Sequence, residues 1–154
     1  EVERPRHGPA HGLVTLGAAV RRHQHPEALG EALAQVGGAH RPEARRGQLE
    51  TLAERIESHV PHDEPLIIAG DFNDWRRRAG RHLHASLGVD ELFLELEGRH
   101  ARSFPVWQPL LAMDRIYYRG VRPLSCQRLS AGPWRELSDH AALMGEFSLP
   151  RKRR

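Results

Sequence analysis

The segment from residue 41 to residue 75 constrains the fold of this chain more than any other part of the sequence. Apolar side chains recur at steps of three and four from Arg41 to Val60, which predicts an amphipathic helix with one face toward a core. The short branched run Pro65–Ala69 then predicts a buried strand. This run breaks abruptly at Gly70 into polar residues, so we expect a loop over Gly70–Trp75 at one edge of a sheet.

The rest of the chain adds one more helix and then changes period. Arg77–Leu87 has a helical pattern that stops at Gly88. Short strand patterns separated by Pro and Gly follow at Ala101–Phe104, Met113–Tyr118, Leu124–Leu129 and Ala141–Leu149. Strand, helix and strand in this order predict an α/β fold, with a mixed, mostly antiparallel sheet and flanking helices.

Length and composition suit one globular domain, since the chain has 154 residues of which 39% are hydrophobic. We assign that domain to residues 41–149. Residues 1–40 have no clear core pattern and are interpreted as a poorly specified, aberrant leader, and residues 150–154 as a solvated basic tail. A net charge of +3 permits a phosphate-rich partner without requiring one.

The strongest local signal for chemistry is Gly70-Asp71-Phe72-Asn73-Asp74, directly after the predicted buried strand. If the segment is extended, Asp71 and Asn73 face the same way, and Phe72 points back into the core. Asp71 then offers a carboxylate to a cation or a proton, and Asn73 offers an amide to a phosphate oxygen. An Asx turn that closes the strand explains the same residues without function.

Two further acidic positions lie at predicted strand ends. Asp114 opens the strand through Tyr118, where it is suited either to orienting a histidine or to forming a surface ion pair with Arg115. Asp139 and His140 precede the last strand. Neighbouring side chains in an extended segment point to opposite sides, so each of these two needs a partner from elsewhere, unless they simply form a polar turn.

Together these motifs resemble the endonuclease/exonuclease/phosphatase superfamily, which has the deoxyribonuclease-I-like fold. The resemblance runs over about residues 44–149 and is carried by short runs in a fixed order. These are Gln48-Leu49 in the first helix, Gly70-Asp71-Phe72-Asn73, Arg102-Ser103-Phe104-Pro105 with Pro109, Asp114-Arg115-Ile116, and Ser138-Asp139-His140. The resemblance implies half of a four-layer α/β sandwich.

The resemblance implies catalytic roles for Asp71, Asn73, Asp114 and His140. His140 is similar to the general base or the group that stabilises the transition-state phosphate, and Asp114 to the carboxylate that orients it. Asp71 is similar to the residue that positions the attacking water or protonates the leaving oxygen. Asn73 resembles a phosphate-contacting amide.

The implied cofactor is Mg²⁺ or Mn²⁺, with Asp139 and Asp71 as metal ligands, because hard cations prefer carboxylate oxygens. The implied activity is metal-dependent hydrolysis of a phosphodiester by water. The substrate class stays open between nucleic acid and a phospholipid or small molecule. Trp75-Arg76-Arg77-Arg78 is suited to nucleic-acid phosphates, but it is equally a solvated helix start.

The resemblance covers only the C-terminal half of the superfamily's domain. The first half supplies an Asn and a metal-binding Glu, and neither has a matching context here. His40 is the nearest in order to a further family histidine, but no strand pattern precedes it. We therefore expect either a chain truncated or frame-shifted upstream of about residue 41, which we favour, or a first half supplied by a companion chain. The alternative function is a non-catalytic remnant that binds nucleic acid weakly.

The remaining features are less specific. Cys126 is the one cysteine, so an internal disulfide is excluded, and we expect a buried small side chain in a strand. A lone cysteine is typical of the cytoplasm, and the Arg and Ala content is typical of a bacterial protein. No apolar run approaches the ~20 residues that span a bilayer, so no transmembrane segment is predicted.

Overall fold

A computed structural model describes residues 42–74 and 78–149 of the chain. The elements are α1 (Pro42–His59), β1 (Leu66–Asp71), α2 (Arg78–Leu87), β2 (Asp90–Glu91), α3 (Leu92–Glu97), β3 (Asp114–Arg119), β4 (Arg122–Leu129), α4 (Trp134–Leu137) and β5 (Ala142–Ser148). The predicted leader with His40, the run Trp75–Arg77 and the basic tail lie outside the described residues.

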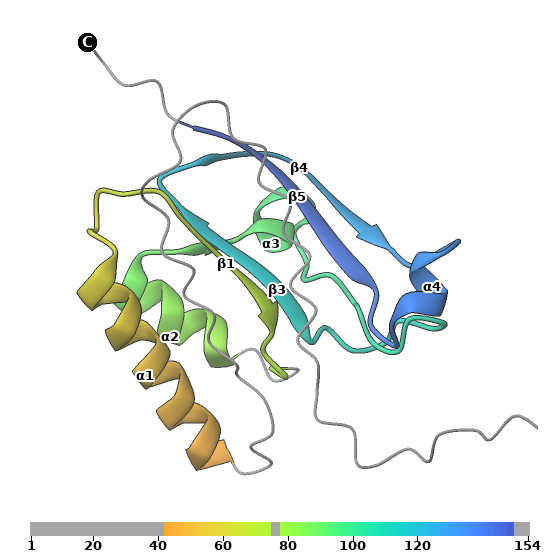
Figure 1. Cartoon of the computed structure of the whole chain (residues 1–154), viewed down its shortest axis with the longest axis horizontal. Helices are drawn as coiled ribbons and strands as arrows, with labels where there is room; N and C mark the ends of the chain where they lie inside the picture. The colour runs from red at the N-terminus through yellow and green to blue at the C-terminus, as the bar shows by residue number, and fades with distance from the viewer. Residues whose placement is uncertain (1–41, 75–77, 150–154) are drawn as a thin grey trace, which may run out of the picture.

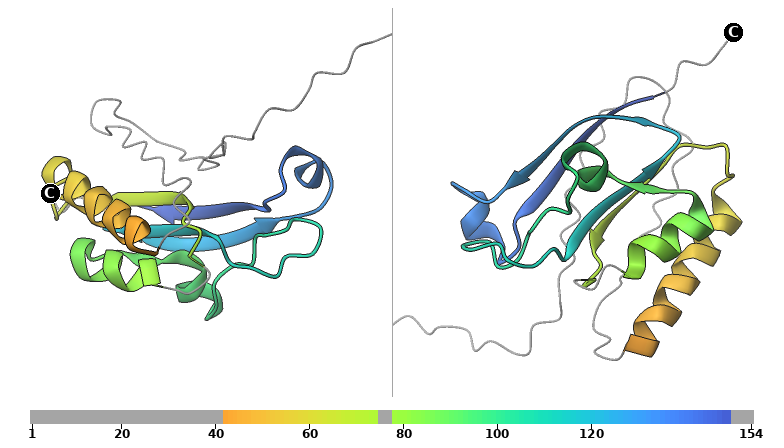
Figure 2. Two further views of the ribbon diagram at one scale, coloured as in Figure 1. Left: turned by 90° about the horizontal axis from the view of Figure 1, so that it is seen from below. Right: turned by 180° about the vertical axis from the view of Figure 1, so that it is seen from behind.

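The described elements stack in layers (Figure 1). Strands β1, β3 and β2 form one antiparallel sheet in that order, and β4 pairs with β5 as a separate antiparallel ribbon. Helices α1 and α2 lie side by side against one face of β1 and β3, while the β4–β5 ribbon lies on the other side (Figures 1 and 2). The predicted α/β class with antiparallel strands and flanking helices is confirmed.

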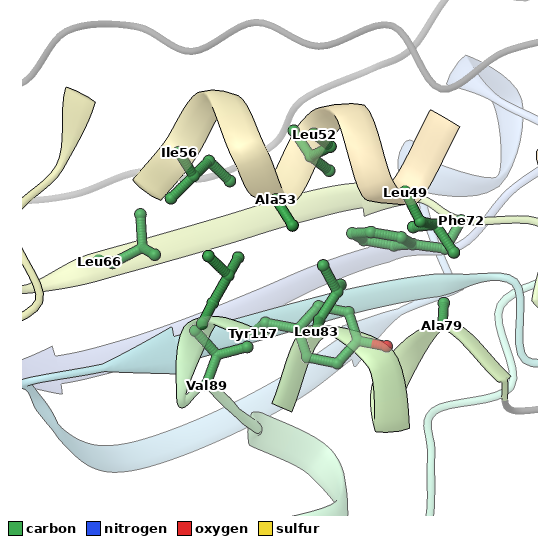
Figure 3. Packing of buried hydrophobic residues seen from close by; sticks show 11 residues of the cluster. Leu49, Leu52, Ala53, Ile56, Leu66, Phe72, Ala79, Leu83, Val89 and Tyr117 are labelled. Atoms are coloured by element: carbon green, nitrogen blue, oxygen red, sulfur yellow. The ribbon is translucent and has the colours of Figure 1, made fainter. Parts of the chain in front are cut away.

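Side-chain alternation along the central strand β3 divides the core in two. Tyr117 packs between the helices, with α1 side chains spaced by three or four residues and with α2 (Figure 3). Its neighbours Ile116 and Tyr118 face the opposite way and pack with α3 and β5. The helix-side cluster contains Leu49, Leu52, Ala53, Ile56, Leu66, Phe72, Ala79, Leu83, Leu87, Val89 and Tyr117.

Helix α3 is held close to the β4–β5 ribbon. Gly98 ends the helix in the left-handed conformation with φ 69°, which favours glycine. On β5, a Cβ atom added to Gly145 would lie 2.5 Å from Cδ2 of Leu92, the first residue of α3. A side chain at this position would therefore require Leu92 to shift, and glycine lets helix and ribbon approach without that shift.

Several predicted boundaries are corrected. Gly70 and Asp71 belong to strand β1 rather than to the loop, because both residues pair with β3. The predicted strand Ala101–Phe104 is wrong: the N–H groups of Ser103 and Phe104 donate to the carbonyl oxygen of Leu111, at 2.8 and 3.1 Å. This segment therefore closes a loop on itself, with only an isolated bridge between Phe104 and Leu111.

Candidate active site

Strand geometry places Asp71 and Asp114 next to each other. They are directly opposed at the ends of the antiparallel strands β1 and β3. Ile67 and Ala69 on β1, and Ile116 on β3, pack in the cluster on the β4–β5 side. Because side chains alternate along a strand, both aspartates belong to that same face of the sheet. Two like charges directly opposed are unfavourable unless a cation or a proton donor lies nearby.

His140, 26 residues further along the chain, lies against Asp114. Its Nδ1 is 2.8 Å from Oδ2 of Asp114. The imidazole is 25% exposed and the carboxylate 19%, so the pair is partly open to solvent. The ring also packs against Phe104, with 4.9 Å between ring centroids, and the His140 N–H donates to Oγ of Ser138 at 3.1 Å. Asp114 and Phe104 thus orient the imidazole, while the hydrogen bond to Ser138 holds the backbone of His140.

The surroundings of His140 favour its protonated form. The hydrogen bond to Asp114 raises the pKa of the imidazole above its usual value, and the charges of Asp114, Asp71 and Asp139 act in the same direction. Partial burial lowers the pKa and is outweighed. A carboxylate only accepts hydrogen bonds, so Nδ1 carries a hydrogen and Nε2 is the acceptor of the neutral ring. Nε2 is the atom that can take up or release a proton.

Ser103 joins the segments that carry Asp114 and His140. Its fully buried side chain accepts hydrogen bonds through Oγ from the N–H groups of Met113 and Asp114, at 3.3 and 3.2 Å. Its carbonyl oxygen accepts from the N–H of Ala141 at 2.7 Å. Ser103 belongs to the run Arg102–Pro105, which carries part of the family resemblance, but nothing in the sequence indicates its role between these segments.

Asp71 and Asn73 are brought together, but not as an extended segment. The N–H of Asn73 donates to Oδ1 of Asp71 at 2.7 Å, and its side-chain Nδ2 lies 3.3 Å from Oδ2. Asn73 has φ 49°, a left-handed conformation that Asn tolerates better than most residues. The Asx-turn interpretation thus describes the backbone correctly. Phe72 between them is buried, as predicted, and its N–H donates to Met113 O at 3.0 Å.

Asp139 is exposed, and its backbone carbonyl accepts a hydrogen bond from Val106 at 2.7 Å. Its carboxylate is close enough to raise the pKa of His140. Within residues 42–74 and 78–149, no group of three or more His, Cys, Asp or Glu side chains is arranged to hold a metal ion. The described residues therefore do not complete a hard-oxygen donor set, and the roles of Asp71 and Asp139 as metal ligands stay predictions.

Cys126 lies in strand β4, as expected, but it is only partly buried, and its Sγ is 3.7 Å from Oε1 of Glu97. Partial burial, together with the Glu97 carboxylate, raises the pKa of its thiol to about 11. A thiol with so high a pKa is a poor nucleophile at neutral pH. Among the described residues, Asp71, Asp114 and His140 therefore form the candidate site.

Comparison with known proteins identifies relatives of this chain. The profile of the Endonuclease/Exonuclease/phosphatase family matches residues 5–140, so the match also takes in most of the predicted leader. The chain is 46% identical to uncharacterized protein YbhP of Escherichia coli K12 over 105 residues, which are 68% of this chain and 41% of YbhP. It is 34% identical to a UPF0294 protein of Yersinia pseudotuberculosis over 103 residues, 65% of this chain and 35% of that protein. No solved structure matches.

Proposed function

Because the chain belongs to the Endonuclease/Exonuclease/phosphatase family, we propose that it forms the part of a phosphoric-ester hydrolase that carries His140 and Asp114. The observation that supports this most is the 2.8 Å contact between these side chains, which come from different strand ends. Asp71 lies opposite Asp114 on the same face of the sheet. The chain spans about two fifths of the length of YbhP, so the activity of a whole protein of this kind is part of the proposal.

In the proposed reaction, His140 moves a proton at Nε2. Its Nδ1–H stays donated to Asp114, which fixes the tautomer and stabilises the imidazolium. The neutral ring would take a proton from the attacking water, and the protonated ring would donate to a phosphate oxygen in the transition state. The raised pKa of His140 increases the share of the protonated form near neutral pH, which favours the second role.

Asp71 and Asn73 are proposed to act on the other side of the phosphate. The hydrogen bonds between them fix the Asp71 carboxylate relative to the loop. A carboxylate held in this way is suited to positioning the attacking water, and in its protonated form the same group could protonate the leaving oxygen. The Asn73 amide is proposed to contact a phosphate oxygen without adding charge.

We propose Mg²⁺ or Mn²⁺ as the cofactor, consistent with a family that is generally dependent on divalent metals. Such a cation would neutralise negative charge on the phosphate. Asp71 and Asp139 are the described carboxylates proposed to contribute to its binding. Since the described residues do not form a complete donor set, we assign no step of the reaction to the cation.

Hydrolysis of bis(p-nitrophenyl) phosphate, with EDTA, Mg²⁺ or Mn²⁺, tests the proposal. We expect turnover that requires a divalent cation and falls by at least about a hundredfold in His140→Gln, since general acid–base catalysis typically contributes this much or more. His84→Gln is the matched control, because His84 also lies near a carboxylate, 3.3 Å from Asp90, but is 66% exposed and outside the site. A folded wild-type chain without turnover would instead support the non-catalytic remnant.

The substrate class also remains a proposal. Nucleic acid and phospholipid or small-molecule phosphodiesters share the phosphoryl group that this site is suited to contact. Comparing the rates on single-stranded DNA, RNA and a short-chain phospholipid separates these classes. Across the described helices, none combines the length and apolar character needed to cross a membrane.

A further inference from the structure

Arg115 is a charged side chain buried within the sheet–helix layer. It lies on β3, directly after Asp114, and is only 1% exposed. Taking a guanidinium out of water is costly unless its N–H groups find acceptors. A residue this deeply buried therefore depends on its hydrogen bonds, and their positions indicate what it holds in place.

The guanidinium of Arg115 donates to two backbone carbonyls that are far apart in the sequence. Its NH1 lies 2.8 Å from the carbonyl oxygen of Asp114, and its NH2 lies 3.2 Å from that of Asp74. The buried carboxylate of Asp74 in turn accepts from the N–H of Ala79 at 2.6 Å, in the first turn of α2. Arg115 thus connects the start of β3 to the loop after β1, and Asp74 connects that loop to the start of α2.

The hydrogen bonds of Arg115 hold the backbone just after the end of β1 and at the start of β3, the two places that carry the candidate site. Asp74 is the next residue after Asn73, so fixing its carbonyl fixes the end of the turn formed by Asp71 and Asn73. Because side chains alternate along β3, Arg115 belongs to the helix side of the sheet and Asp114 to the opposite face. Arg115 is therefore placed to act through the backbone rather than on a substrate.

We propose that Arg115 is a positioning residue, whose buried guanidinium sets the spacing between the Asp71–Asn73 turn and Asp114. The importance of Arg115 for activity rests on the function proposed above. The effect of Arg115 on the turn can be measured even if the chain has no activity. The proposal is supported by two hydrogen bonds from one planar guanidinium, to the carbonyl oxygen of Asp114 and to that of Asp74. A planar fork can satisfy both at once, which a lysine ammonium cannot do in the same way.

The same strand offers a matched control. Arg119 is also buried, at 7% exposed, and its guanidinium donates to the carbonyl oxygens of Leu87 at 2.8 Å and Pro61 at 2.9 Å. It lies at the far end of the pairing, opposite Leu66, whereas Asp114 is opposite Asp71. Both arginines brace backbone carbonyls, but only Arg115 reaches the site.

The experiment compares Arg115→Lys with Arg119→Lys by amide hydrogen exchange of the whole chain. In Arg115→Lys we expect the Phe72 and Asn73 amides to exchange faster. Their rates should rise about ten- to a hundredfold more than the loss of global stability alone would explain. In Arg119→Lys these two amides should follow global stability alone, as measured by urea unfolding. Equal acceleration in both variants, once corrected for global stability, would overturn the proposal.

Steady-state kinetics provide the second measurement. A positioning role predicts a kcat at least about tenfold lower in Arg115→Lys, with KM within about twofold, because the reacting groups are displaced while substrate contacts remain. Arg119→Lys should leave both values near wild type. If Arg115→Lys does not fold, Arg115→Gln takes its place, since it keeps N–H donors without a buried charge. A wild type without turnover would refute the proposed function but leave the exchange test decisive.

Discussion

Two of the carboxylate–histidine pairs in the described part of this chain have the same contact distance but different surroundings. Asp114 and His140 are 2.8 Å apart, and so are Glu91 and His100. In the first pair the side chains are 19% and 25% exposed, and in the second 4% and 12%. A carboxylate beside an imidazole is therefore not sufficient to indicate a site.

The oxygen atoms of Glu91 are already engaged in structure. Besides His100, they accept hydrogen bonds from the N–H groups of Leu94 at 2.8 Å and Phe93 at 3.4 Å, which cap the start of α3. A buried cap of this kind stabilises the helix, and His100 then ties it to the following segment. This pair holds the start of α3 against β2, and its side chains are too buried to offer much surface to a ligand.

The Asp114–His140 pair is instead held in place by residues around it. Backbone and side-chain groups of Ser103, Ser138 and Phe104 fix its position. Its carboxylate orients an imidazole that remains partly exposed, near the charges of Asp71 and Asp139. The oxygen atoms of Glu91 are used to hold helix α3, which leaves that pair little room for a ligand. The Asp114–His140 pair is held in place by other residues, and its imidazole stays partly exposed.

The largest expected effect comes from Asp114→Asn. An amide can present N–H to Nδ1 of His140 and stabilise the wrong tautomer, so we expect kcat to fall by about 10³- to 10⁴-fold. Glu91→Gln, measured under conditions where it is folded, should keep kcat within a few-fold of wild type. Hydrolysis of bis(p-nitrophenyl) phosphate by both variants is the measurement. Equal losses in the two variants would remove the distinction between the pairs.

Glu91→Gln should instead have the larger effect on stability. The change replaces a buried carboxylate that accepts from a helix start and from His100, so we expect the free energy of unfolding to fall by about 2–3 kcal/mol. Urea unfolding followed by circular dichroism measures this. Asp114→Asn changes a more exposed pair, so its free energy of unfolding should fall by less. A larger loss for Asp114→Asn than for Glu91→Gln would contradict this interpretation.

The sequence was sufficient to predict the α/β class and the elements that have strong periodicity. Helix α1 and strands β1, β3, β4 and β5 follow predicted runs to within a few residues, because each run is bounded by Pro, Gly or a polar break. The sequence also indicated that His140 needs a distant partner, although this rested on an extended segment and residues 139 and 140 form a bend. The catalytic and metal-binding roles of these residues stay predictions.

The parts that were missed depend on contacts between segments distant in the sequence. Helix α3 is six residues long and starts from a cap by Glu91, which no periodic pattern reveals. Arg115 reads in the sequence as half of a surface ion pair, but the fold buries it against the carbonyl of Asp74. The left-handed conformation of Asn73 likewise depends on its hydrogen bonds to Asp71.

Ser103→Ala should have an intermediate effect. The change leaves the N–H groups of Met113 and Asp114 without their hydroxyl acceptor in a fully buried place, so we expect a loss of about 1–2 kcal/mol in unfolding free energy. Because Ser103 supports Asp114, kcat should fall as well. The exposed Ser58, whose Oγ donates to Arg55 O at 2.9 Å, provides the control Ser58→Ala, with little expected change in either quantity.

The smallest expected effect is a pH dependence of stability that arises from His140. Its hydrogen bond to Asp114 raises the folded-state pKa above the ordinary value of 6.5. The resulting stabilisation is fully present below the unfolded-state pKa and is lost as pH rises through the folded-state pKa, because the folded chain binds the proton more tightly. The loss of stability in His140→Gln should therefore be greater at about pH 5.5 than at about pH 8.5.

Urea unfolding of wild type and His140→Gln across this pH range measures the effect, with His84→Gln as the exposed control. A difference between wild type and His140→Gln that grows with rising pH would mean that the imidazole is held neutral, as in a pair dominated by burial. Asp114 would then not stabilise an imidazolium, and the proposed proton transfer at His140 would lose its support.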